Sequence, residues 1–252
     1  MNVLGIDIGS HGIKGCIVDT EKGEIISERK STPALTDTTP HKVLAQMHQI
    51  VRNEFAWKGP IGCAFPAPVN NGIVLSAKRI DTSWVDTNAE QLFSDITDNP
   101  VTVINDTDAT GLAEIHFGAG QHQEGLTIVL TVGTGIGSSL FMDGQLVPNT
   151  ELGIMEIDGI TIEERASNKS RKEEGIPKKT WAKRLELMLE HFEKVFHPTL
   201  FILGGQLSQK TEKTFPYIKI TTTFKPADFQ NDASIVGAAM IAGNKKNEIF
   251  YR

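Results

Sequence analysis

The sequence predicts an α/β fold built from two similar halves. Each half contains an apolar strand that runs into a glycine-rich turn and then into a second strand. The first occurrence is Val3–Ile8 with its turn Gly9-Ser-His-Gly12, and the second is Leu126–Thr131 with its turn Gly133–Gly137. Further apolar strands alternate with amphipathic helices in both halves, which is the pattern of α/β proteins. We therefore expect two structurally duplicated halves.

The first half begins as an antiparallel meander. Short β-rich runs separated by glycine turns predict strands at Val3–Ile8, Ile13–Val18 and Glu24–Glu28. A capping threonine followed by proline predicts a helix that starts at Thr39. The remaining strands of this half are expected at Ile61–Phe65, Ile73–Ala77 and Val101–Ile104, and a second helix is expected at 88–96.

The second half repeats this logic. A hairpin is expected from Ile136–Phe141 and Gln145–Val147, with Asp143-Gly144 as its turn. A long helix follows whose apolar side includes Trp181, Leu185 and Phe192. A strand at Leu200–Leu203 and a small-residue helix at 234–242 complete the chain.

Composition places the chain among globular proteins. It has 252 residues, of which 39% are hydrophobic, enough to bury a sizeable core. No apolar stretch reaches 18 residues and the first residues already form a strand, so we expect a cytoplasmic protein without a membrane partner. Cys16 and Cys63 lack metal-ligand spacing and are expected to be buried free thiols. The net charge of −6 argues against nucleic acid as a partner.

The glycine turns are candidate phosphate sites. Glycine has no Cβ and tolerates positive φ, so consecutive backbone N–H groups can converge on an anion at the end of a strand. Asp7 stands at the mouth of the first turn, where its carboxylate could hold a magnesium ion. Such turns also occur purely as tight turns. For either turn alone, a phosphate site and a tight turn without a ligand are about equally favoured.

Asp106 is the candidate catalytic group. It follows the strand Val101–Ile104 at the point where a helix begins. In α/β sheets the carboxyl ends of the strands line the ligand crevice, which favours a chemical role. The alternative is that Asp106 only caps the helix, a common use of aspartate there.

Two charged segments follow the second hairpin. Glu151, Glu156, Glu163 and Glu164 could bind sugar hydroxyls or could be solvated loop charge. The segment 168–184 contains seven basic residues and only two acidic ones. This predicts either a binding surface for a polyanion or a solvated helix face. These basic residues are Lys169, Arg171, Lys172, Lys178, Lys179, Lys183 and Arg184.

Six motifs in order resemble the polyphosphate glucokinase branch of the ROK sugar kinases. They are Asp7-Ile-Gly, Asn105-Asp106-Thr-Asp-Ala-Thr-Gly-Leu-Ala-Glu114, Thr131-Val-Gly-Thr-Gly-Ile-Gly137, Val147-Pro-Asn-Thr-Glu-Leu-Gly153, Glu163-Glu-Arg-Ala-Ser167 and Ile235-Val-Gly-Ala-Ala239. The resemblance spans essentially the whole chain. It implies an α/β, actin-like ATPase fold with two RNase-H-like lobes and an active-site cleft between them. The expected division is 1–106, 107–232 and a C-terminal helix, 233–252, that packs on the first lobe.

The resemblance also implies an activity and residue roles. The chain would be a Mg²⁺-dependent kinase that uses polyphosphate or ATP to phosphorylate a hexose, by default glucose, and would form a homodimer. Asp106 would be the general base, with Asn105, Glu151, Glu163 and Arg79 at the sugar and Asp7 at magnesium, through water. No structural zinc is expected. Donor phosphates would be held by Gly9, Gly12, Lys14, Thr131, Gly133, Thr134, Gly135, Gly137, Gly204 and Gly205.

Departures from the family pattern gather mainly at the sugar side. Ile154 stands where a sugar-contacting histidine is usual, Ala67 replaces a glycine, and Arg79 replaces an asparagine. On the donor side Ser10 and His11 alter the first turn, where His11 could bind phosphate or have no role, and Gln206 replaces a third glycine. Two alternatives therefore stay open: a kinase for another acceptor, and a weakly catalytic sugar- or phosphate-binding protein.

Overall fold

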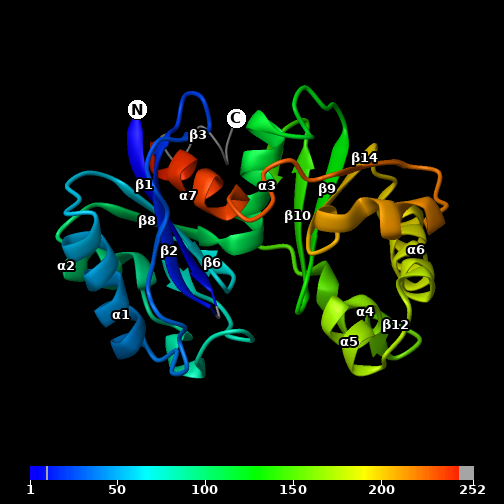
Figure 1. The fold of residues 1–252 in the computed structure, drawn as a ribbon, viewed down its shortest axis with the longest axis horizontal. Helices are drawn as coiled ribbons and strands as arrows, with labels where there is room; N and C mark the ends of the chain where they lie inside the picture. Colours follow the sequence, from blue (N-terminus) through cyan, green and yellow to red (C-terminus); the bar gives the residue numbers. More distant parts are fainter. Residues whose placement is uncertain (10, 244–252) are drawn as a thin grey trace. The chain divides into compact units, whose positions relative to one another are not determined.

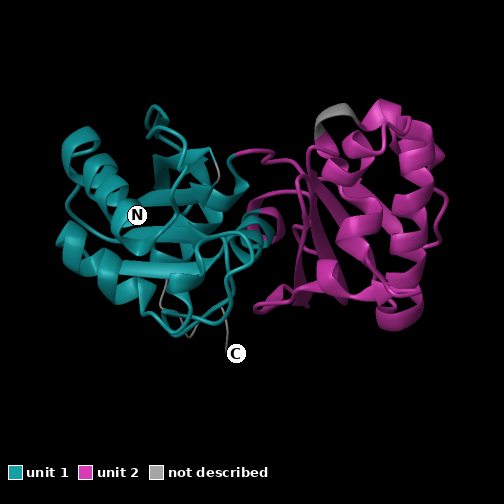
Figure 2. Cartoon of the chain, turned by 90° about the horizontal axis from the view of Figure 1, so that it is seen from below, with its two compact units in different colours: residues 1–113, 232–252 teal, residues 114–231 magenta. Residues whose placement is uncertain are grey.

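The computed structural model describes residues 1–9 and 11–243. The chain divides into two compact units (Figure 2). Unit 1 comprises residues 1–113 and the segment from Asp232 onward, and unit 2 comprises residues 114–231. Ser10, part of the first predicted phosphate turn, lies outside the described residues, as do positions 244–252 of the predicted C-terminal segment.

Unit 1 is built on a sheet of order β3-β2-β1-β5-β8, with β4 paired to β2 (Figure 1). The first three strands form the predicted antiparallel meander, and β1, β5 and β8 run parallel. A small hairpin, β6 with β7, stands apart from this sheet. The strands are β1 (Asn2–Gly9), β2 (Gly12–Asp19), β3 (Glu24–Ile25), β4 (Lys30–Ser31), β5 (Ile61–Phe65), β6 (Val69–Asn70), β7 (Ile73–Val74) and β8 (Val101–Asn105).

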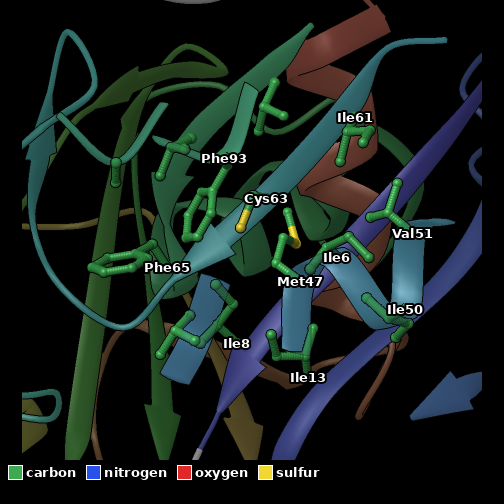
Figure 3. Close-up of a cluster of buried hydrophobic side chains, with 14 of the residues drawn as sticks. Ile6, Ile8, Ile13, Met47, Ile50, Val51, Ile61, Cys63, Phe65 and Phe93 are labelled. Atoms are coloured by element: carbon green, nitrogen blue, oxygen red, sulfur yellow. The ribbon is translucent and has the colours of Figure 1, made fainter. Parts of the chain in front are cut away.

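Helices α1 and α2 supply the apolar side chains that close the core of unit 1. Ile6 and Ile13 from the sheet, Met47 from α1 and the buried Cys63 of β5 belong to one cluster of core side chains (Figure 3). Phe65 packs edge-on against Trp84, with ring centroids 5.0 Å apart. The helical segments are α1 (Pro40–His48), the π-helical turn η1 (Gln49–Glu54), the 3-10 turn η2 (Thr82–Trp84), α2 (Ala89–Thr97) and α7 (Ala233–Gly243), together with α3 (Asp106–Phe117), which begins in unit 1 and ends in unit 2.

Helix α7 approaches the sheet through glycines. A Cβ on Gly5 of β1 would lie 2.3 Å from the carbonyl oxygen of Ile235, and one on Gly62 of β5 would lie 1.7 Å from that of Ala238. On the helix itself, a Cβ on Gly237 would lie 1.8 Å from the carbonyl oxygen of Ala109 in α3. These positions exclude every larger side chain, which explains the small-residue composition of the predicted helix 234–242.

Unit 2 repeats the topology of unit 1. Its sheet has the order β11-β10-β9-β14-β15, again three antiparallel strands followed by two parallel additions. This confirms the predicted duplication. The strands are β9 (Leu126–Val132), β10 (Ile136–Met142), β11 (Gln145–Val147), β14 (Leu200–Gly205) and β15 (Thr223–Pro226), with a separate hairpin of β12 (Glu156–Ile157) and β13 (Ile160–Thr161).

The core of unit 2 lies between its sheet and α6. Trp181, Leu185 and Phe192 of α6 are buried, as predicted, against sheet residues such as Leu130 and Phe201. The helical segments are η3 (Leu152–Ile154), α4 (Ile162–Ala166), α5 (Asn168–Glu173), α6 (Lys178–Phe196), η4 (Ser208–Lys213) and η5 (Phe215–Tyr217).

Two predicted strands are shorter than expected. The expected strand Glu24–Glu28 ends at Ile25, because the Ile17 N–H donates to the Ser27 side-chain oxygen at 2.8 Å in place of a backbone carbonyl. The expected strand Ile73–Ala77 ends at Val74. Its partner β6 is preceded by Pro68, which has no N–H to extend the ladder.

Candidate active site

The first glycine turn joins β1 to β2 beside Asp7. Asp7 lies directly opposite Lys14 in the antiparallel ladder, so the two side chains share one face of the sheet. Among the described residues other than its chain neighbours, a Cβ on Gly9 would have only the Asp7 carboxylate within 4 Å, at 3.9 Å. Gly12 has φ +100°, and a Cβ there would lie 2.4 Å from the Thr32 carbonyl oxygen. The turn therefore needs glycine at position 12.

Asp7 is surrounded by charges of both signs. Burial, followed by the negative charge of Asp106, raises the pKa of Asp7 to about 6. Lys14, a hydrogen bond from Ser234 and the charge of Arg29 act in the opposite direction. Arg29 is itself paired with Asp232, the residue before α7. Neither Arg29 nor Ser234 was predicted as part of the site, because nothing local in the sequence connects them to β1.

Asp106 is the first residue of α3, directly after β8. The helix is capped by Asn105, whose side-chain oxygen accepts from the N–H groups of Thr107 (2.9 Å) and Asp108 (3.1 Å). The cap that was the alternative role for Asp106 is thus made by its neighbour. Burial raises the pKa of Asp106 above its ordinary value of 3.8, and the Arg79 guanidinium partly offsets this shift.

The positions that depart from the family pattern have different environments. Ala67 is buried, and its N–H donates to the Phe65 carbonyl. Arg79 acts electrostatically on Asp106 within unit 1. Ile154 ends the turn η3 of unit 2 and is 44% exposed, so an apolar group faces outward where the family has a polar one.

The second glycine turn connects β9 to β10. It is closed by a bond from the Gly133 N–H to the Gly135 carbonyl at 2.9 Å, and Thr131 pairs with Gly137 across the two strands. Among the described residues other than its chain neighbours, no heavy atom lies within 4 Å of the position that a Cβ on Gly133 would take. We expected positive φ to make the N–H groups converge, but Gly133, Gly135 and Gly137 all have other backbone conformations. What Gly133 contributes is open space next to the backbone.

The start of this turn is clamped by two residues from distant segments. The Gln206 N–H donates to the Val132 carbonyl, and the Asn168 N–H donates to the Gly133 carbonyl, both at 2.9 Å. The Asn168 side-chain amide donates to the Gln206 side-chain oxygen, which closes the clamp. Gly204 and Gly205 pair with Thr131 and Val132 at the end of β14. Gly205 has φ +71°, and a Cβ there would lie 2.7 Å from the Val132 carbonyl.

The end of the turn is held by the predicted sugar-binding segment. Glu163 accepts the Ile136 N–H through its carboxylate at 2.8 Å. A Cβ on Gly153 would lie 2.2 Å from the Ile136 carbonyl, so the Glu-Leu-Gly segment also packs on this residue. The Ser138 hydroxyl donates to the Thr150 carbonyl at 2.7 Å and accepts the Leu152 N–H at 2.9 Å. Ser138 therefore fixes both neighbours of Glu151, a role that its position in a buried strand did not reveal.

The seven basic residues of the segment 168–184 are divided between α5 and α6. Several already have partners in the structure. Arg184 forms two hydrogen bonds with Glu174 (2.6 and 2.7 Å), Lys183 pairs with Glu186 at 2.7 Å, and Lys169 lies 3.9 Å from Glu173. Lys179 lies over the Tyr217 ring, and Arg171 lies over Trp181. Whether this surface receives a polyanion stays a prediction.

Two other features are absent from the part of the chain that the structure describes. Within residues 1–9 and 11–243, no cluster of three or more His, Cys, Asp or Glu side chains is placed to hold a metal ion. In the same residues, no helix has the length and apolarity needed to cross a membrane.

Known proteins are similar to this chain over nearly its whole length. The polyphosphate glucokinase of Mycobacterium tuberculosis (strain CDC 1551 / Oshkosh) is 41% identical over 238 residues, which cover 94% of this chain and 89% of the relative. That of Mycobacterium leprae (strain TN) is also 41% identical, covering 94% and 73%. An inorganic polyphosphate/ATP-glucomannokinase from Arthrobacter sp. strain KM has a TM-score of 0.92 and 40% identity, covering 96% of this chain and 98% of that structure.

These matches confirm the predicted actin-like ATPase fold. The sequence model of the ROK family matches residues 3–153, more than half of the chain. Together with the two 41% identical relatives, this establishes the identity that the six motifs had indicated. The chain belongs to the ROK family.

Proposed function

We propose that the chain is a glucokinase that transfers the terminal phosphoryl group of inorganic polyphosphate or ATP to a hydroxyl group of glucose, forming glucose 6-phosphate. The relatives at 40–41% identity support this class of reaction. The observation that carries the proposal is the environment of Asp106. Its carboxylate has a raised pKa and stands at the end of β8, while Asn105 caps the helix. Asp106 is therefore suited to accept a proton.

The chemistry assigned to Asp106 is general-base catalysis. Its carboxylate accepts the proton of the attacking sugar hydroxyl as the new bond from oxygen to phosphorus forms. The bond from this phosphorus to the donor's bridging oxygen breaks, and the leaving group is ADP or a polyphosphate shortened by one unit. A positioned base typically contributes about 10²–10⁴-fold to the rate.

We propose that Asp7 takes part in binding Mg²⁺, through water. Mg²⁺ usually keeps several waters and binds through one or two carboxylates together with substrate phosphates. The residues fit this mode, because Asp7 is a carboxylate whose ionised form is disfavoured by burial and by Asp106, and a cation would relieve that repulsion. When bound, the ion would neutralise charge on the transferring phosphates.

The donor phosphates are assigned to the two glycine turns. In unit 1 these are Gly9, Gly12 and Lys14, whose ammonium group lies on the same face of the sheet as Asp7. In unit 2 they are Thr131, Gly133, Thr134, Gly135 and Gly137, with Gly204 and Gly205 at the neighbouring strand end. The open space at Gly133 supports close approach of an anion to the backbone.

The sugar is assigned to Asn105, Glu151, Glu163 and Arg79. The Asn105 side-chain oxygen is engaged by the cap, so its amide NH₂ is the group offered to a hydroxyl. Arg79 and Ile154 change the polarity of this side relative to the family pattern, which makes mannose a second acceptor to test. A relative named as a glucomannokinase supports including it. We further propose that the chain acts in the cytoplasm as a homodimer.

The test is a phosphotransfer assay with purified protein and Mg²⁺, in which polyphosphate and ATP are each paired with glucose, mannose and other hexoses. Asp106→Asn is the control, since it keeps the size of the side chain and removes the base. We expect glucose phosphorylation that the control lowers by about 10²–10⁴-fold, with sugar affinity changed by less than about threefold. Near-normal turnover in Asp106→Asn would overturn the assignment of the base. Sugar binding without transfer from either donor would instead support the weakly catalytic alternative.

A further inference from the structure

Glu163 is the residue at which the segment assigned to the sugar touches the turn assigned to the donor. Its carboxylate oxygen Oε2 accepts the Ile136 N–H at 2.8 Å. Ile136 follows the turn 133–135 and is the first residue of β10. It lies directly opposite Val132, the last residue of β9. The contact therefore lies at the base of the glycine turn, 27 residues away in sequence from the carboxylate that makes it.

The position of Glu163 is set by its own helix. Ile162 and Ala166 of α4 are buried in the core of unit 2. The helix start is fixed by a capping box between Thr161 and Glu164, and the Ile162 N–H donates to the Met155 carbonyl at 2.8 Å. Because both ends of this short helix are anchored, the Glu163 side chain is presented to Ile136 from a fixed base.

A second contact on Ile136 comes from the other carboxylate segment. Gly153 lies so close to the Ile136 carbonyl that a Cβ would be only 2.2 Å from it. Ser138, two residues further along β10, holds the neighbours of Glu151. Both glutamates assigned to the sugar are thus tied to the first residues of β10, Glu163 through its side chain and Glu151 through the backbone of its neighbours Thr150 and Leu152.

We infer that Glu163 couples the two substrates: the carboxylate that binds the sugar also holds the donor turn through Ile136, so that each substrate strengthens the binding of the other. The inference rests on the proposed function in that Glu163 is taken as a sugar ligand. A carboxylate offers two oxygens and about four lone-pair sites, so one group can accept from the Ile136 N–H and from a sugar hydroxyl together.

The physical basis is a shared ordering cost. The Glu163 carboxylate, which already accepts the Ile136 N–H, loses its rotamer freedom only once when a sugar hydroxyl binds to it as well. Once the sugar has fixed the carboxylate, the turn is ordered at less cost and the donor binds more tightly. Thermodynamic linkage requires the reverse effect, of the donor on the sugar, to be equally large.

The experiment is a set of calorimetric titrations on the full chain with Mg²⁺. Polyphosphate and the ATP analogue AMPPNP are titrated without and with saturating 6-deoxyglucose, which lacks the reacting hydroxyl and so prevents turnover. For the donor that the chain uses in the transfer assay, we expect the sugar analogue to tighten binding by at least about fivefold, the lower end of usual allosteric couplings. In Glu163→Gln the sugar should bind at least about tenfold more weakly, and the coupling should fall below about twofold at saturating sugar, since the neutral amide is the weaker acceptor on both sides.

Glu190→Gln is the charge-matched control, because Glu190 lies on α6 of the same unit, outside the segments assigned to the sugar and the donor and outside the capping box of α4. It should keep the wild-type coupling. Two results for Glu163→Gln would overturn the inference. Weaker sugar binding with unchanged coupling would make Glu163 a sugar ligand alone, and weaker donor binding with unchanged sugar affinity would make it only a support of the turn.

Hydrogen exchange on the wild-type chain keeps the inference testable if the variant does not fold. Glucose alone should slow exchange of the Ile136 amide, and an unchanged rate would overturn the inference. The two proposals fail differently. A chain that phosphorylates glucose but binds donor equally with and without the sugar analogue retains its function and lacks the coupling, whereas a chain that neither binds nor phosphorylates glucose loses both.

Discussion

Asp7 and Asp106 share one electrostatic environment: burial of Asp7 and the negative charge of Asp106 raise the pKa of Asp7 to about 6. Burial also raises the pKa of Asp106 itself. Two acids that must both be ionised in the proposed reaction are therefore harder to ionise than ordinary aspartates.

The first prediction concerns the pH dependence of activity. Raised carboxyl pKa values mean that protonation removes the base and the magnesium ligand at higher pH than usual. We expect kcat/KM for glucose phosphorylation to fall as the pH drops through about 6, the value for Asp7. Initial rates between pH 4.5 and 8.5 in constant ionic strength measure this. A profile that stays flat down to pH 5 would contradict it.

The second prediction concerns stability. The pKa of Asp7 is higher in the folded chain than the ordinary 3.8, so the folded state binds the proton more tightly than the unfolded one, and stability is lost as the pH rises from about 4 to about 6. Asp7→Asn removes this ionisation. We expect the variant to be about 1–3 kcal/mol more stable than wild type at pH 8 without Mg²⁺ or donor, and equal near pH 4. Urea unfolding at both pH values measures the difference, and a variant less stable at pH 8 would contradict it.

The third prediction separates donor binding from folding. Within the described part of the chain, a Cβ on Gly133 meets no heavy atom within 4 Å apart from its chain neighbours, and the residue does not have positive φ. Gly133→Ala should therefore change the free energy of unfolding by less than about 1 kcal/mol. The methyl group would occupy the space proposed for a phosphate, so we expect the KM of the donor to rise at least about tenfold while the sugar affinity is kept. An unchanged donor KM would remove Gly133 from the donor site.

The fourth prediction concerns Gly237, a glycine that, unlike Gly133, has no room for a larger side chain. A Cβ on Gly237 would lie 1.8 Å from the Ala109 carbonyl oxygen and 2.6 Å from its carbon, so α7 and α3 would have to move apart. Gly237→Ala should destabilise the chain by about 3 kcal/mol, at the upper end of overpacking effects. Thermal unfolding beside Gly133→Ala, the same substitution at an open position, is the direct comparison. Equal melting temperatures for the two variants would show that the contact is not tight.

The fifth prediction tests the basic segment. Lys178, Lys179 and Lys183 are changed together to glutamate, and the polyphosphate KM is measured at low salt. If this surface attracts polyphosphate, the KM should rise at least about tenfold, and the difference from wild type should shrink at high salt, because salt screens exposed charges. The KM of ATP serves as the internal control and should change less. An unchanged polyphosphate KM would identify the segment as a solvated helix face.

The architecture was largely predictable because periodicity and turn chemistry are local signals. Val3–Ile8, Ile61–Phe65 and Leu200–Leu203 are apolar runs of strand length, and each lies within a strand of the structure. The repeated pattern of a strand, a glycine turn and a strand was enough to predict two halves with one topology. The lengths of short strands were less predictable, since the end of β3 depends on the Ser27 side chain replacing a backbone partner.

The candidate site residues could be named from the sequence, but their connections could not. The sequence pointed to Asp106 and to the glycine turns, but it could not say which residue caps α3. The cap depends on which way the Asn105 side chain turns. The bonds from Glu163 to Ile136 and from Asn168 to Gly133 join segments 27 and 35 residues apart, and neither leaves a local pattern. The supporting residues Ser138 and Arg29 went unpredicted for the same reason.

The interleaved order of the two units bears on how the chain is made. Unit 2 is one continuous segment, whereas unit 1 needs α7, which is synthesised after unit 2. Gly5 of β1 and Gly62 of β5 mark the strip of the sheet on which α7 packs. Until α7 leaves the ribosome, this strip is not covered by that helix. Unit 2 can therefore complete its fold first, and unit 1 closes last although its strands emerge first. A ribosome that stops before Asp232 would release a chain with this strip exposed, a substrate for chaperones and proteases.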